Sequence, residues 1–241
     1  MFDHVTIRVS AREASQRFYD TVLATLGILT TYEDGRFAEW DDFSLTAADD
    51  DNPVTRGLHI GFVAPTREHA ARFWRAGTEA GYREDGPPGP RPEYGDDYYG
   101  AFLLDPDGNS AEAVHHDEVR RPGHVDHLWI RVADRAAAER FYETIAPYSG
   151  FVRTDDSENA HFVGAGGSLS LVAGTPTTEH VHLAFPARDN ATVDAFHRAA
   201  IEAGYRDNGA PGERAIYHPG YYAAYVLDPD GHNIEVVNHN R

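Results

Sequence analysis

The chain contains no cysteine, and all 21 of its basic residues are arginine, so lysine is absent as well. These absences exclude disulfide bonds, thiolate nucleophiles, zinc–thiolate sites, Schiff-base lysines and the phosphate-binding lysine of P-loop enzymes. A cysteine-free chain without an export signal also predicts a cytoplasmic location.

Positive charge is scarce throughout the sequence. Its 39 acidic and 21 basic residues give a formal net charge of -18 over 241 residues. Because phosphate groups need positive charge to bind, this composition argues against nucleic acids and anionic membranes as partners. No apolar run approaches the roughly 18 residues that a membrane span requires. We therefore expect the partner to be a small-molecule substrate.

The sequence repeats itself with a constant offset of 123 residues. The recurring segments are QRFYDT at 16–21 and ERFYET at 139–144, EAGYR at 79–83 and at 202–206, and YYGAFLLDPDG at 98–108 and YYAAYVLDPDG at 221–231. This offset indicates a tandem duplication. We predict one domain at 1–118 and another at 124–241, joined by a charged, Pro- and Gly-containing linker at 119–123. Such a chain is a monomer with an internal pseudo-dimer, or a homodimer.

Hydrophobic periodicity divides each repeat into two similar units. In the first repeat it predicts strands at 4–9, 30–33, 36–40, 43–48, 58–63, 82–84, 98–104 and 110–115, and helices at 12–26 and 66–80. The order is strand, helix, three strands, and then the same again. We predict an α+β fold of four βαβββ modules, with curved mixed sheets and helices on their outer faces. Pro147 should shorten the first helix of the second repeat.

Three residues of metal-ligating types are retained in strands of both repeats. His4 matches His127, His59 matches His182, and Glu112 matches Glu235, each pair being 123 residues apart. Two neutral imidazoles and one carboxylate form a facial triad that leaves coordination positions open on a divalent ion.

A single histidine in a strand is more often structural than a ligand, but the joint retention of all three residues favours metal binding. The histidines on helices or near strand ends, His69, His197, His115, His116 and His239, are expected to be solvated.

These residues lie in segments that resemble the vicinal oxygen chelate superfamily, which includes glyoxalase I, fosfomycin-resistance thiol transferases, extradiol dioxygenases and bleomycin-resistance proteins. The segments are 3–9, 58–62 and 105–112, and their copies are 126–132, 181–185 and 228–235. The resemblance implies paired βαβββ modules that form a cup around one divalent metal. It also implies that the six retained residues are ligands, and that the metal acts as a Lewis acid on adjacent substrate oxygens.

Glyoxalase I adds a fourth ligand, a glutamate on the strand before the second histidine. In this chain that strand is 43–46 in the first repeat and 168–171 in the second, and neither contains a carboxylate. A three-ligand site therefore resembles the thiol transferases and the extradiol dioxygenases more closely. Bleomycin-resistance proteins usually lack the triad, so its retention counts against a pure binding protein.

The second repeat also resembles the extradiol dioxygenase signature, with His218, Ala224-Tyr225, Asp228-Pro229, Gly231 and Glu235 in the expected order. Ala224 departs from the larger residue expected there. The resemblance implies that His218 lies next to the metal ligands without binding the metal itself. It also implies that Tyr225 hydrogen-bonds a substrate oxygen. The first repeat has Gly95 and Phe102 instead, so Tyr225 could equally be a core aromatic.

Other residues could line the mouth of the cup. Tyrosines precede or begin the seventh strand of each repeat, at Tyr94, Tyr98 and Tyr99 and at Tyr217, Tyr221 and Tyr222. Arg91 or Arg214 could bind an anionic group of the substrate.

We therefore predict a divalent-metal enzyme acting on a small oxygenated molecule. The specific hypothesis is an Fe(II) extradiol-type dioxygenase in the C-terminal half, with His127, His182 and Glu235 as ligands. The alternatives are a glyoxalase-like lyase or isomerase or a thiol transferase that uses Zn²⁺, Mn²⁺ or Ni²⁺, and a non-enzymatic binding protein. The pairing is also open: each repeat could close on itself, or His4 could join His182 and Glu235 while His127 joins His59 and Glu112.

Overall fold

The computed structural model describes residues 2–117, 123–154 and 160–241. The elements of the first repeat are β1 (His4–Val9), α1 (Arg12–Leu23) with a 3₁₀ turn (Ala24–Leu26), β2 (Tyr32–Glu33), β3 (Phe37–Trp40), β4 (Phe43–Ala47), β5 (His59–Val63), α2 (Arg67–Glu79), β6 (Glu84–Pro90), β7 (Tyr99–Leu104) and β8 (Ser110–His115). Those of the second are β9 (Val125–Val132), α3 (Arg135–Ser149), β10 (Phe151–Thr154), β11 (Ala160–Gly164), β12 (Gly167–Ala173), β13 (His182–Pro186), α4 (Asn190–Glu202), β14 (Arg206–Glu213), β15 (Tyr222–Leu227) and β16 (Asn233–Asn238).

The predicted α+β fold of four strand–helix–three-strand modules is confirmed. One prediction about it is wrong: α3 runs through Pro147 to Ser149 and is longer than α1. Pro147 lies in the last turn, where its fixed φ suits a helix and its missing N–H removes one hydrogen bond. The predicted linker at 119–123, except Gly123, lies outside the described residues, and the predicted domain limits stay a prediction.

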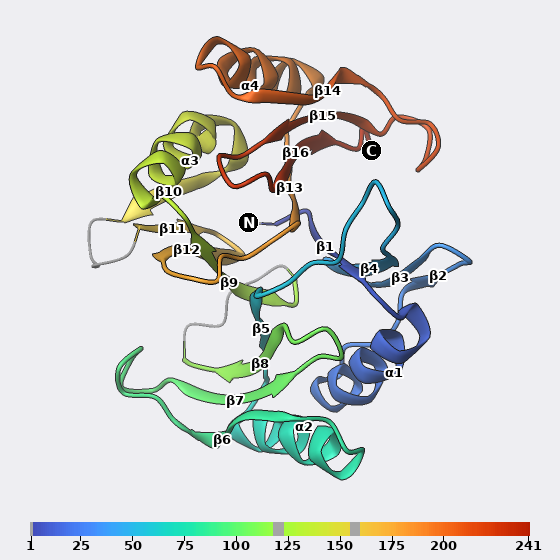
Figure 1. The fold of residues 1–241 in the computed structure, drawn as a ribbon, viewed down its shortest axis with the longest axis vertical. Helices are drawn as coiled ribbons and strands as arrows, with labels where there is room; N and C mark the ends of the chain where they lie inside the picture. The colour runs from blue at the N-terminus through green and yellow to red at the C-terminus, as the bar shows by residue number, and fades with distance from the viewer. Residues whose placement is uncertain (1, 118–122, 155–159) are drawn as a thin grey trace.

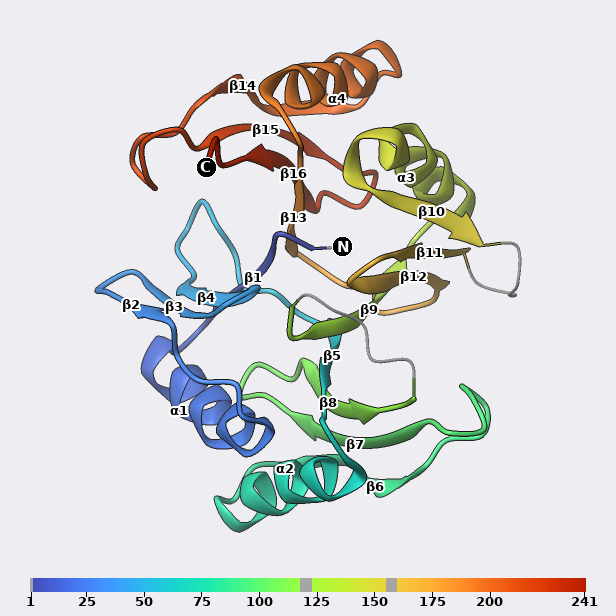
Figure 2. The same cartoon turned by 180° about the vertical axis from the view of Figure 1, so that it is seen from behind.

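Two eight-stranded mixed sheets form the framework, and each takes half of its strands from each repeat. One has the order β14-β15-β16-β13-β1-β4-β3-β2, and the other β10-β11-β12-β9-β5-β8-β7-β6. The repeats join where β1 pairs antiparallel with β13, and where β5 pairs antiparallel with β9. Figures 1 and 2 show these strands at the middle of the molecule. A cup in this protein is therefore built from both repeats.

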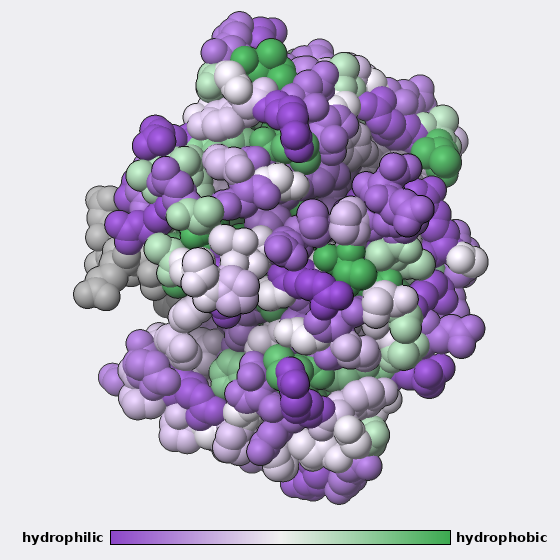
Figure 3. Space-filling model, viewed as in Figure 1, coloured by the Kyte–Doolittle hydropathy of each residue, from purple (hydrophilic) through white to green (hydrophobic). Residues whose placement is uncertain are grey.

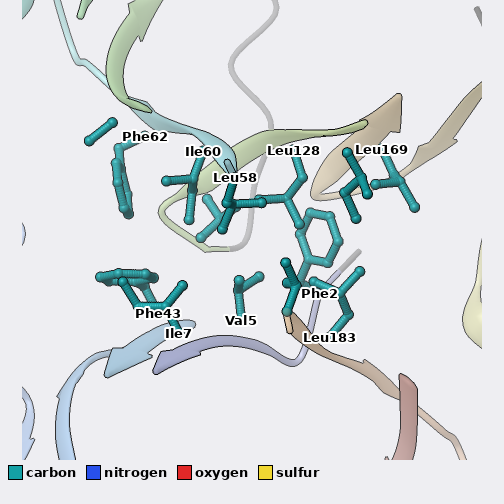
Figure 4. Close-up of a cluster of buried hydrophobic side chains, with 14 of the residues drawn as sticks. Phe2, Val5, Ile7, Phe43, Leu58, Ile60, Phe62, Leu128, Leu169 and Leu183 are labelled. Atoms are coloured by element: carbon teal, nitrogen blue, oxygen red, sulfur yellow. The ribbon is translucent and has the colours of Figure 1, made fainter. Parts of the chain in front are cut away.

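Strand alternation separates a core face from a concave face in each sheet. On β1, Val5, Ile7 and Val9 are fully buried, whereas His4 and Arg8 are only partly buried. Figure 4 shows side chains of the first sheet, including Val5, opposing side chains of the second, including Leu128. The two sheets therefore pack through their apolar faces, and their polar faces are turned outward.

The four helices cover the apolar faces where the sheets diverge. Helices α1 and α2 pack against each other on one side, and α3 and α4 do so on the other (Figure 1). Each brings aromatic residues to the core, such as Phe18 and Tyr19 of α1 and Phe141 and Tyr142 of α3. This arrangement leaves the concave faces of both sheets free of helices.

Most of the face shown in Figure 3 is hydrophilic, and its hydrophobic residues form small separate groups. Within the described ranges, no helix combines the length and the apolar character needed to cross a membrane.

Replacing Leu128 with alanine tests the contact between the sheets. Leu128 is fully buried, so Leu128→Ala should lower the free energy of unfolding by about 2–5 kcal/mol, measured by urea denaturation. The matched control is Val152→Ala on β10, where the side chain is 66% exposed and the expected change is within about 0.5 kcal/mol. Equal effects of the two variants would contradict the packing described above.

Candidate metal centres

The concave face of the first sheet brings together His4, His182 and Glu235, here called centre A. The Nε2 atoms of His4 and His182 are 3.2 Å apart. Glu235 Oε2 lies 3.0 Å from His182 Nε2 and 3.6 Å from His4 Nε2. Glu235 and His182 are buried, while His4 is partly exposed.

The second sheet repeats this arrangement with His59, Glu112 and His127, here called centre B. The Nε2 atoms of His59 and His127 are 3.1 Å apart. Glu112 Oε2 lies 3.0 Å from His59 Nε2 and 3.2 Å from His127 Nε2.

The spacing of these atoms suits a single metal ion. Two donors held at right angles about 2.1 Å from an ion are separated by roughly 3.0 Å. The separations of 3.0–3.6 Å in both centres are therefore those of three ligands on one face of an ion. Two imidazoles and a carboxylate are also the donor types that Fe²⁺, Mn²⁺ and Zn²⁺ accept.

The structure decides which residues share a centre. It separates His127 from His182 and Glu235, so the proposed ligand set within the C-terminal half is wrong. The reason is the strand pairing: β13 lies beside β1, and β9 lies beside β5. Of the two pairings that the sequence left open, the exchanged one is formed.

One histidine of each centre is held by a carboxylate through its other ring nitrogen. Asp3 Oδ1 is 2.9 Å from His4 Nδ1, and Asp126 Oδ2 is 3.1 Å from His127 Nδ1. An acceptor at Nδ1 keeps the proton there and turns the Nε2 lone pair towards the site. Asp3 and Asp126 are also 123 residues apart, so the repeat offset could have identified them.

A further histidine supports each of these aspartates. His239 Nε2 lies 2.8 Å from Asp3 Oδ2, and His116 Nε2 lies 2.8 Å from Asp126 Oδ1. The expectation that His116 and His239 are merely solvated is therefore wrong. Each imidazole helps to fix the carboxylate that orients a candidate ligand.

The remaining histidine of each centre has a polar neighbour on the adjacent strand. Ser110 Oγ is 3.2 Å from His59 Nδ1 and donates to Asp85 Oδ2 at 2.7 Å. Asn233 occupies the matching place: its Nδ2 lies 2.6 Å from His182 Nδ1, and its Oδ1 accepts from Asn208 Nδ2. If Nε2 is the ligand atom, the Asn233 amide must present its oxygen to Nδ1–H.

A tyrosine donates to the carboxylate of each centre. Tyr98 Oη donates to Glu112 Oε1 at 2.8 Å, and Tyr221 Oη donates to Glu235 Oε1 at 2.7 Å. This leaves Oε2 of each glutamate to face the two histidines. The sequence indicated these tyrosines only as lining of the mouth, although their 123-residue offset was visible.

Charge pairing offsets the cost of burying these groups. At centre B, burial raises the pKa of Glu112, but hydrogen bonds and charges of His127 and His59 lower it to about 2. Burial lowers the pKa of His127, but Asp126 and Glu112 outweigh burial and raise it to about 9. At centre A, Asp3 and Glu235 likewise outweigh burial and raise the pKa of His4, whereas burial lowers the pKa of His182.

His218 and Tyr225 both belong to the surroundings of centre A. His218 Nε2 lies 2.9 Å from His239 Nδ1, and its Nδ1 donates to the Pro219 carbonyl. It therefore extends the row of contacts from Asp3 towards the surface. The Tyr225 ring lies 6.3 Å from the His182 ring, on the strand that pairs with Glu235.

Neither centre has a fourth carboxylate from the strand beside its first histidine. On β4, Ser44 pairs with Thr6, and their hydroxyls are hydrogen-bonded at 2.7 Å. On β12, Ser168 and Ser170 pair with His127 and Trp129. Each candidate group within the described residues thus has three members.

Centre B opens into a pocket of about 300 Å³. Its aromatic lining comes from Tyr94, Tyr98, Phe102 and Trp129, and its charged lining from Asp85, Arg91 and Glu93 in addition to Glu112. The pocket has room for a small ligand beside the three candidate donors.

Two solved structures have the same fold as this chain over nearly its whole length. Glyoxalase I from Zea mays superposes with a TM-score of 0.67 at 18% identity, covering 99% of this chain and 92% of that one. A "putative dioxygenase" from Bacillus subtilis has a TM-score of 0.68 at 14% identity, covering 100% of this chain and 85% of that one. At these identities the likeness establishes the fold alone. No curated protein matches the sequence significantly.

A family model described as "Glyoxalase/Bleomycin resistance protein/Dioxygenase superfamily" matches residues 1–113 and matches again at residues 124–236. The two matches cover both repeats and all six candidate ligands. The chain therefore belongs to the glyoxalase/bleomycin resistance protein/dioxygenase superfamily.

Proposed function

We propose that this protein is a divalent-metal enzyme that binds adjacent oxygen atoms of a small substrate at centre A, centre B or both. The observation that carries this proposal is the convergence of two imidazole nitrogens and one carboxylate oxygen, within 3.6 Å of one another, in each of two cups. A bound divalent ion would supply Lewis acidity and open coordination positions at these atoms.

The groups around the donors support binding rather than mere burial. Asp3 and Asp126 fix one imidazole in each centre, while Tyr98 and Tyr221 occupy one oxygen of each glutamate. Such contacts hold ligand atoms in place before the ion arrives, which lowers the ordering cost of binding.

Within this proposal, the favoured reaction is Fe(II)-dependent, extradiol-type oxygenation of a catechol-like substrate at centre A. The feature that favours it is Tyr225, a hydroxyl-bearing residue beside His182 where centre B has Phe102. Burial, the Glu235 charge and a hydrogen bond with Glu235 raise the pKa of Tyr225, so its hydroxyl stays protonated and can turn from Glu235 to donate to a substrate oxygen. His218 acts through His239 and Asp3, and is a positioning residue.

Metal content tests the centres directly. Protein purified without added metal, or reloaded after chelation, should bind about two divalent ions per chain. Glu235→Ala and Glu112→Ala should each reduce this to about one, because each removes one ligand from a different centre. Glu33→Ala, at a half-exposed side chain on β2, should leave two ions bound. Mass spectrometry of metal content gives the measurement, and two ions in Glu235→Ala would contradict centre A.

The pH dependence of metal binding tests the electrostatics of centre B. His127, with its pKa raised to about 9, must lose a proton to become a ligand. Below about pH 9 the apparent affinity should therefore rise by up to tenfold per pH unit, and above it the affinity should level off. Titration of the Glu235→Ala variant isolates centre B, and an affinity independent of pH between 6.5 and 9 would contradict this protonation state.

Oxygen dependence tests the reaction. After anaerobic loading with Fe(II), exposure to air and a catechol panel should give oxygen uptake and ring-cleavage absorbance. Tyr225→Phe should lower kcat about a hundredfold, because it removes one donor to the reacting oxygen. The control is Tyr222→Phe, whose hydroxyl binds Asp194 instead.

The other outcomes point to the rival functions. Turnover that persists without oxygen would replace oxygenation by a lyase, isomerase or thiol-transfer reaction. Tight ligand binding without turnover, retained in His182→Ala, would indicate a protein that sequesters its ligand.

A further inference from the structure

The concave face of the first sheet continues beyond centre A to Arg8. His4, Thr6 and Arg8 alternate along β1, so their side chains share one face. On β4, Thr46 pairs with Arg8, and on β3, Phe37 pairs with Thr46. Arg8 therefore lies in the same cup as the candidate ligands, one step further from them than Thr6.

Two other arginines approach the same cup from its rim. The Arg36 guanidinium lies 5.1 Å from the centre of the Phe37 ring, and the Arg214 guanidinium lies 5.5 Å from the centre of the Tyr225 ring. Tyr217 is influenced by the charges of these arginines and by the charge of Glu235 in centre A. Burial and the Glu235 charge raise its pKa, and the charges of Arg36, Arg214 and Arg8 oppose this rise. Tyr217 therefore lies within electrostatic range of Glu235 and of the three guanidinium groups.

These three positive charges lack a direct counter-ion. In the part of the chain that the structure describes, no carboxylate lies within 4.0 Å of Arg8, Arg36 or Arg214. The carboxylate that acts on the half-buried Arg8 over a longer distance is Asp49, which lies in an exposed loop. A half-buried guanidinium without a paired carboxylate is costly, and an anionic ligand would relieve that cost.

Centre B differs at the matching positions. Trp129 replaces Thr6, and Arg131 replaces Arg8 but is exposed, with its guanidinium directed to the Pro176 carbonyl. Arg91, the counterpart of Arg214, shares its pocket with Asp85 and Glu93. Among the residues that the structure describes, the lining of centre B is therefore aromatic and without excess positive charge, although the two sets of candidate ligands are of the same types.

We propose that centre A takes a substrate that carries an oxyanion, a carboxylate or a phosphate, and that Arg8, Arg36 and Arg214 bind it. This inference rests on the proposed function, because the rest of the substrate would reach the three candidate ligands. Guanidinium groups suit such a ligand because they donate two parallel hydrogen bonds to carboxylate or phosphate oxygens. The net charge of -18 repels anions from the rest of the surface, so binding should be confined to this cluster.

The test uses inorganic phosphate and acetate as probes of chelator-treated, metal-free protein at constant ionic strength. Titration followed by ³¹P NMR for phosphate, and by calorimetry for acetate, should show saturable binding of at least one of them. The stronger of the two identifies the oxyanion class. Arg8→Gln should weaken that binding about tenfold or more, since it removes a charge-assisted hydrogen bond. The matched variant Arg131→Gln, at the same position of the other repeat, should change it less than twofold.

Two results would overturn the inference: no saturable binding of either probe, or equal weakening by Arg8→Gln and Arg131→Gln. If Arg8→Gln fails to fold, the pair Arg214→Gln and Arg91→Gln provides the same contrast, and thermal unfolding checks each variant. Metal content is measured in parallel. Absence of anion binding in a protein that takes up two ions when metal is added back rejects only this inference. Anion binding in a protein that takes up no ion when metal is added back rejects the proposed function.

Discussion

The antiparallel contact between the two repeats, β1 with β13 and β5 with β9, is the constraint on which the rest of the structure depends. It places His4 beside His182 and His127 beside His59, and so assembles both candidate centres from parts that neither repeat holds alone. The apolar faces of the same central strands pack sheet against sheet, as Figure 4 shows for Val5 and Leu128. The same strands therefore build both the core and the two centres.

Much of this could be predicted because duplication preserves what both halves need. The 123-residue offset isolated all six candidate ligands, and strand alternation indicated that they face one side of a sheet. The exchanged pairing could not be predicted, since both arrangements use the same strands with the same internal alternation. The supporting residues Asp3, Tyr98 and His116 obey the offset too. Aspartate, tyrosine and histidine have so many structural uses that only their contacts in the folded chain reveal the role.

The two centres keep the same candidate ligands but have different surroundings. Tyr225 and Phe102 occupy matching places beside their histidines, and Thr6 and Trp129 do so on the strands that join the repeats. The ligand geometry is shared while the lining differs in charge and aromatic content, so the two centres offer different surroundings to a small molecule. Duplication within one chain makes such divergence possible, since each cup is encoded by its own residues.

The central claim is that each centre draws ligands from both repeats, and the metal content of two double variants tests it most directly. His4→Ala with Glu235→Ala removes two ligands from centre A alone, so about one ion per chain should remain. His4→Ala with Glu112→Ala removes one ligand from each centre, so almost no ion should remain. The reverse pattern, no ion in the first variant and one in the second, would show that each repeat closes on itself and would contradict the account.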